Sequence, residues 1–109
     1  MRTDTTILGF GTAGNSIAQN TNIASCLSVT PGRYRLTGTG RHSLADGLKI
    51  TGIPAGTIII PGGPGDTVTF PTIVFDLTAA SSNIQVALNT ATGASDTAAA
   101  VLCLEKINH

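Results

Sequence analysis

The segment from Thr72 to Ile107 constrains the fold more than any other part of the sequence. It holds two runs in which apolar side chains alternate with polar or small ones, and a third run that is almost wholly apolar. The alternating apolar positions are Ile73, Phe75, Leu77, Ile84, Val86 and Leu88. A period of two places one face of each run against a core. The segment therefore predicts three successive β-strands.

The third run, Thr97 to Leu104, has no polar face before Glu105 and Lys106. A strand of this composition is expected to be covered on both faces, and a second copy of the chain is one candidate for a cover. Only 11% of the residues are charged, against about 25% in an average domain. A surface so poor in charge suits a subunit that neighbours cover. We predict a homotrimer, with a dimer as the alternative.

The remaining chain also consists of short strand-like runs separated by turn signals. The predicted strands are Ile23–Val29, Gly32–Thr39, Leu48–Ile50, Thr57–Ile60 and Val68–Phe70. We expect loops at Gly40–Gly47 and at Pro61–Asp66, where prolines lack the N–H that a sheet ladder needs. About eight short antiparallel strands without a long helix predict an all-β fold, a single-domain β-sandwich that is jelly-roll-like.

Residues 1–20 are polar and small apart from one apolar cluster, formed by Ile7, Leu8 and Phe10. We interpret them as an N-terminal arm or edge strand, and residues 21–109 as the β-sandwich domain. Ordering each residue costs about 1–2 kcal/mol of backbone entropy, more than this cluster alone offsets. We therefore expect the arm to contribute more to attachment than to folding.

The charge distribution and hydropathy exclude several partners. The formal net charge is zero, which argues against nucleic-acid binding. No apolar run reaches the ~18–20 residues of a membrane helix, and the N-terminus lacks the apolar core of a secretory signal. Arg33, Arg35 and Arg41 lie in a stretch without acids between Thr5 and Ala45. They indicate a solvated or ion-paired face, or contact with an acidic partner surface.

The two cysteines, Cys26 and Cys103, lie in apolar strand-like runs. We expect reduced, buried thiols that behave as small hydrophobic side chains, with a disulfide between them as the alternative. Two cysteines without a histidine at metal-ligand spacing do not make a zinc site. No metal or cofactor is expected.

Two motifs resemble known functional sites, a nucleotide-binding loop and a catalytic triad. The glycines of Gly9–Gly14 have the spacing of a dinucleotide fingerprint, but no acid follows at about 20 residues, no helix follows, and no parallel strands alternate with helices. His42, Ser43 and Asp46 contain the residue types of a catalytic triad, yet they crowd into one predicted loop, where the base is not oriented from its far side. Neither nucleotide binding nor catalysis is expected.

Threonine pairs recur two residues apart, an arrangement that ice-binding surfaces also use. The pairs are Thr37/Thr39, Thr67/Thr69 and Thr90/Thr92, and each is predicted to share one strand face. Threonine is a good strand former on a polar face, so we interpret the pairs as ordinary strand surface.

The segments Pro31–Leu36, the loop up to Leu48, and Asn89–Ile107 together resemble small accessory virion proteins of tailed bacteriophages, the cement or decoration proteins of capsids. The resemblance lies in a Pro-Gly-x-Tyr strand entry, few charges, abundant Thr, Gly and Ala, and an apolar last strand. It implies a non-enzymatic β-sandwich, often trimeric, made in the bacterial host cytoplasm without disulfides and located on the capsid surface of the virion. It carries no functional residues over.

The first functional hypothesis is therefore a structural virion protein that bridges and stabilises major capsid protein subunits. The alternative is a phage fibre, tail or lectin-like β-sandwich module that binds a cell-surface glycan. Sugar sites present aromatic platforms, and three of the four aromatic residues are expected to be buried, which weakens the alternative. An enzyme is not expected. The candidate partner contacts are Ile7, Leu8, Phe10, Arg33, Arg35 and Arg41.

Overall fold

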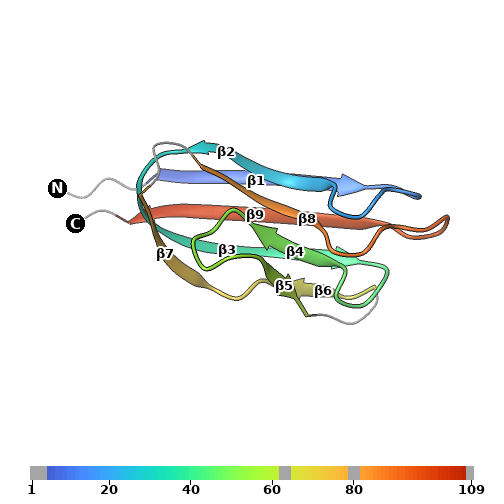
Figure 1. The fold of residues 1–109 in the computed structure, drawn as a ribbon. Helices are drawn as coiled ribbons and strands as arrows, with labels where there is room; N and C mark the ends of the chain where they lie inside the picture. Colours follow the sequence, from blue (N-terminus) through green and yellow to red (C-terminus); the bar gives the residue numbers. More distant parts are fainter. Residues whose placement is uncertain (1–4, 62–64, 79–81, 108–109) are drawn as a thin grey trace.

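The computed structural model describes residues 5–61, 65–78 and 82–107. This part of the chain contains β-strands and turns and no helix (Figure 1). The strands are β1 (Thr5–Ala13), β2 (Asn22–Val29), β3 (Gly32–His42), β4 (Leu48–Thr51), β5 (Ile58–Ile60), β6 (Thr67–Thr69), β7 (Ile73–Leu77), β8 (Ser82–Leu88) and β9 (Ala98–Ile107). The predicted all-β class is confirmed. Of the predicted loop Pro61–Asp66, residues 62–64 lie outside the described part.

The strands form two antiparallel sheets. The first has the order β1-β9-β3-β6, with β7 also paired to β3, and the second has the order β2-β8-β4-β5. Because β6 and β7 pair with successive stretches of β3, they are two halves of one strand that Pro71 interrupts. When β6 and β7 are counted as one strand, eight strands alternate between the sheets, except that the consecutive β4 and β5 both lie in the second sheet, as in a jelly roll. The predicted jelly-roll-like sandwich is confirmed.

The core lies between the two sheets. It is lined by the strand faces that the alternation of apolar residues predicted to be buried. Phe75 and Leu77 of β7 are buried, and so are Ile84, Val86 and Leu88 of β8. The intervening side chains of these strands are more exposed, apart from the small Ala87. The three strands expected between Thr72 and Ile107 are therefore present as β7, β8 and β9.

Strand β3 extends to His42, so the prediction of a loop beginning at Gly40 is wrong. A Cβ atom at Gly38 or at Gly40 would lie 2.9 Å from the ring of Phe70. That ring is fully buried against β3. The glycines therefore make room for a core side chain and do not break the strand.

In the single chain, only one face of the last strand is covered. The side chains of Ala98, Ala100, Leu102 and Leu104 are buried, but the Val101 side chain between them is 45% exposed. Strand β9 lies between β1 and β3 (Figure 1), and its outer face is open. Small side chains on this face, such as Ala99, expose little apolar area. The cost of exposing this face of the strand to water is therefore small. Cover by a second copy remains a prediction.

Strand β1 forms one edge of the first sheet and pairs with β9 at each of its nine residues. Ile7 packs against the core. A Cβ atom at Gly9 would lie 2.5 Å from the carbonyl oxygen of Ser25 in β2, and one at Gly11 would collide with the carbonyl of Ile23. The glycines that resemble a nucleotide fingerprint therefore allow two backbones of opposite sheets to approach closely.

Candidate functional site

The register of the first sheet aligns side chains on its outer face into rows. One row consists of Phe10, Val101, Thr39 and Thr69, taken from β1, β9, β3 and β6. The next consists of Thr12, Ala99, Arg41 and Thr67 from the same strands. Residues on one face of neighbouring strands lie within contact distance. Two residues that the sequence analysis named separately, Phe10 and Arg41, are thus brought to the same place.

These two rows enclose a hollow of about 320 Å³. Its lining residues come from four strands and are Phe10, Gly11, Thr12, Thr39, Gly40, Arg41, Thr67, Ala99, Ala100 and Val101. The long side chains of Phe10 and Arg41 stand on β1 and β3, and the shorter side chains of Ala99 and Val101 lie on β9 between them. The alternation of long and short side chains across three strands produces the hollow.

Phe10 is the exposed aromatic residue of this surface, with 76% of its area accessible. The other three aromatic residues, Tyr34, Phe70 and Phe75, are buried, as predicted. Leu8, one row away on β1, is 60% exposed and lies opposite Cys103, outside the lining of the hollow. Of the predicted apolar contacts, Leu8 and Phe10 are therefore accessible to a partner, while Ile7 is half-buried against the core.

The three arginines of β3 differ in their partners. Arg33 donates to Asp76 at 2.9 Å, and Arg35 is paired with Glu105. The hydrogen bond from Arg33 holds the pKa of the Asp76 carboxyl below its usual range. For Arg41, no carboxylate partner or side-chain hydrogen bond is found among residues 5–61, 65–78 and 82–107. An arginine that has no carboxylate partner among the described residues therefore borders the hollow.

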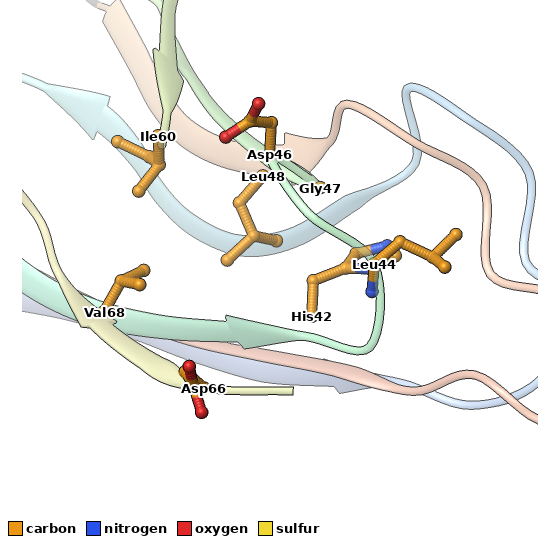
Figure 2. Close-up of a pocket in the computed structure, with 8 residues that line it drawn as sticks. All are labelled: His42, Leu44, Asp46, Gly47, Leu48, Ile60, Asp66 and Val68. Carbon is orange, nitrogen blue, oxygen red and sulfur yellow. The ribbon is translucent and has the colours of Figure 1, made fainter. Parts of the chain in front are cut away.

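A second, much smaller pocket lies between the loop after β3 and the start of β6 (Figure 2). Its volume of about 10 Å³ is roughly that of one water molecule. It is lined by His42, Leu44, Asp46, Gly47, Leu48, Ile60, Asp66 and Val68. Figure 2 shows Asp46 and Asp66 on opposite sides of this pocket, so the two carboxylates do not face each other as a pair. The pocket is too small for an organic ligand.

His42 is buried, and its two ring nitrogens are engaged by the backbone. The N–H of Leu44 donates to Nδ1 at 2.8 Å, and Nε2 lies 2.9 Å from the carbonyl oxygen of Thr90. Because Nδ1 accepts, Nε2 carries the proton and donates it. Ser43 instead exchanges hydrogen bonds with Thr97, and the Asp46 carboxylate points away from the ring in Figure 2. These three residues hold loops together and do not form a triad.

Thr90 and Thr92 do not lie on a strand, so that part of the threonine prediction is wrong. Strand β8 ends at Leu88, and Thr92 is buried in the loop that follows. Its hydroxyl donates to the carbonyl of Gly14 and accepts from the N–H of Ile17, both at 2.7 Å. Thr92 therefore connects the loop after β1 to the loop before β9. The local sequence around Thr92 does not predict this role.

The cysteines are free thiols in different settings. Cys26 is buried between the sheets, and burial, with a smaller effect of Cys103, raises the pKa of the Cys26 thiol to about 11. Cys103 lies between the buried Leu102 and Leu104 and is partly exposed. Within the described residues no group of three or more His, Cys, Asp or Glu side chains is placed to hold a metal ion. The same residues include no helix long and apolar enough to cross a membrane.

No protein-family model matches the sequence, and no curated protein is significantly similar to it. Among solved structures, a family two carbohydrate esterase from Cellvibrio japonicus is similar over 97% of this chain, with 15% identity and a TM-score of 0.48. The chain spans only 34% of that esterase. Over 93% of this chain, the C-terminal CBM6 of LamC, a marine laminarinase from Zobellia galactanivorans, is similar with 11% identity and a TM-score of 0.47.

A third similar structure is the carbohydrate binding module CBM6cm-2 from Cellvibrio mixtus lichenase 5A, in complex with cellotriose. It has 18% identity and a TM-score of 0.41, and the match covers 96% of each chain. The CBM6 of LamC is itself matched over 98% of its length.

Proposed function

We propose that this chain is a non-catalytic β-sandwich module that binds a glycan in the hollow on the outer face of the first sheet. The observation that carries the proposal is the exposed ring of Phe10 beside that hollow. A large aromatic side chain left in water at the margin of a concavity is typical of a binding surface.

The chemistry of the hollow matches that of a sugar ring. A pyranose has a face of C–H groups, which packs against an aromatic ring, and a rim of hydroxyl groups. The hollow offers Phe10 for the face and the hydroxyls of Thr12, Thr39 and Thr67 for the rim. A threonine hydroxyl both donates and accepts, as a sugar hydroxyl does.

The hollow is also built for binding without rearrangement. Phe10, Thr39, Arg41 and Ala99 all lie on paired strands, so their backbone is already ordered. Groups held on regular strands lose less conformational freedom on binding than groups on loops. Binding in the hollow therefore needs little ordering of the backbone.

Substitution of Phe10 tests the proposal. The wild type is screened against neutral and acidic oligosaccharides by calorimetry, and Phe10→Ala is compared with Leu8→Ala, which removes an exposed apolar side chain of the same strand outside the hollow. We expect Phe10→Ala to weaken binding at least about fivefold, because burial of even part of an exposed Phe ring contributes about 1 kcal/mol. Leu8→Ala is expected to leave it unchanged. Absence of binding at millimolar concentrations, or equal binding by Phe10→Ala, would refute the proposal.

A second candidate function uses the same face as a protein interface. Leu8, Phe10 and Val101 form an exposed apolar group that spans two strands. A structural virion protein, assembled as a homotrimer that bridges major capsid protein subunits, would bury such a group. Here both Leu8→Ala and Phe10→Ala would weaken self-association in sedimentation experiments. A wild type that sediments as a monomer at micromolar concentration would count against this candidate.

A further inference from the structure

We infer that the glycan is acidic, and that the guanidinium of Arg41 pairs with the carboxylate of a uronic acid unit. This inference rests on the proposed function of the hollow and specifies its ligand. It starts from the contrast among three arginines of one strand. Arg33 and Arg35 have carboxylate partners on neighbouring strands, and Arg41 has none within the described part of the chain.

The position of Arg41 directs its charge into the hollow. It lies on β3 directly opposite Ala99 and Thr67, and all three residues line the hollow. Both neighbours are short, so they do not cover a guanidinium that stands beside them. Arginine presents five N–H donors in a planar fork that matches a carboxylate in two parallel hydrogen bonds. The partner that Arg41 lacks among the described residues is thus an anion.

In the part of the chain that the structure describes, no acidic side chain neutralises this charge from within the hollow. None of the lining residues is Asp or Glu. The acid nearest in sequence to Thr67 is Asp66, which lines the separate small pocket together with Val68 (Figure 2). A concave surface with charge of one sign concentrates ligands of the opposite sign. The hollow therefore selects against a purely neutral sugar in favour of an anionic one.

Phe10 and Arg41 are spaced for one ligand. They stand on β1 and β3, which are separated by β9 alone. They also lie in successive rows, two residues apart along the strands. With about 4.8 Å between neighbouring strands and about 3.4 Å per residue, their backbones lie roughly 12 Å apart. A sugar ring packed on Phe10 above Val101 can therefore direct a carboxylate, its own or that of the next unit, toward Arg41.

The experiment compares acidic oligosaccharides with their neutral esters. Oligogalacturonate and oligomannuronate, each beside its full methyl ester, are titrated calorimetrically into wild type, Arg41→Gln and Arg33→Gln at low salt. Esterification removes the charge and keeps the sugar. We expect the wild type to bind at least one acidic oligomer about three- to tenfold more tightly than its ester. This preference should shrink when salt is raised, because exposed charges are screened.

Arg41→Gln is expected to reduce the preference to less than about twofold, with the affinity for the ester unchanged. Arg33→Gln is the matched control, since it removes an exposed arginine of the same strand outside the hollow. Equal affinity for acid and ester, or a preference that survives in Arg41→Gln, overturns this inference and leaves the glycan-binding proposal standing. The same holds if only neutral glycans bind. Failure of every glycan to bind overturns both.

Discussion

Replacement of Gly11 with alanine should destabilise the fold, although Gly11 lies on a strand where alanine is normally tolerated. The new Cβ atom would collide with the backbone carbonyl of Ile23 in β2. A backbone group cannot rotate aside as a side chain does, so β1 and β2 must separate. Overpacking of this kind costs about 1–3 kcal/mol. Alanine also lowers the conformational entropy of the unfolded chain, which offsets about 0.4–1 kcal/mol of this cost. The free energy of unfolding should therefore fall by roughly 1–2 kcal/mol.

Gly14→Ala is the matched control for this prediction. Gly14 belongs to the same glycine-rich segment, but a Cβ atom there meets no atom within 4 Å. Urea unfolding followed by far-ultraviolet circular dichroism should show a midpoint lowered by about 1 M for Gly11→Ala and unchanged or slightly raised for Gly14→Ala. Neither variant should lose affinity for NAD or FAD, because the wild type should have none. Equal midpoints for wild type and Gly11→Ala would show that close approach of β1 to β2 is not the reason for the glycine.

Three further predictions concern stability and reactivity. Deletion of residues 2–13 removes all nine pairs that β9 makes with β1, so we expect loss of cooperative melting; a truncated chain that melts within a few degrees of the full one would instead support an arm that serves attachment. His42→Ala leaves two backbone groups without their side-chain partner and should cost about 2–4 kcal/mol; a change below 0.5 kcal/mol on the scale of surface substitutions would contradict the role given to the ring. At pH 8 an alkylating reagent should modify Cys103 and spare Cys26 in the native protein, because burial raises the pKa of Cys26 to about 11; intact mass shows this, and a two-proton deficit under denaturing conditions would reveal a disulfide.

Local alternation was sufficient to predict most strands. Ile84, Val86 and Leu88 alternate with polar or small residues, and this pattern depends only on neighbours in sequence. Pro71 also marks the break between β6 and β7 correctly. Gly40 was misinterpreted because a glycine that ends a strand and one that admits a distant ring look alike in sequence. The ring of Phe70 that explains it lies 30 residues further along the chain.

The candidate site was predictable only in part. Phe10 and Arg41 were both named as partner contacts, the first as part of an apolar cluster and the second for its charge. Their juxtaposition depends on the register of β9 with both β1 and β3, since Val101 and Ala99 lie between them. That register joins residues about 60–90 positions apart, and no short-range pattern encodes it. The ion pairs that single out Arg41 also depend on long-range pairing, of β3 with β7 for Arg33 and of β3 with β9 for Arg35.

Chemical-shift mapping tests glycan binding in the hollow most directly. Isotope-labelled wild-type protein is titrated with oligogalacturonate, with its methyl ester and with a neutral glucan oligomer, and backbone amide signals are followed by nuclear magnetic resonance. We predict shifts concentrated around Phe10, Arg41 and Ala99 on the first sheet, largest for the acidic oligomer, with none around Lys49 in β4 of the second sheet. Shifts that cluster on the second sheet, or no shifts with any of the three ligands, would contradict binding at this surface.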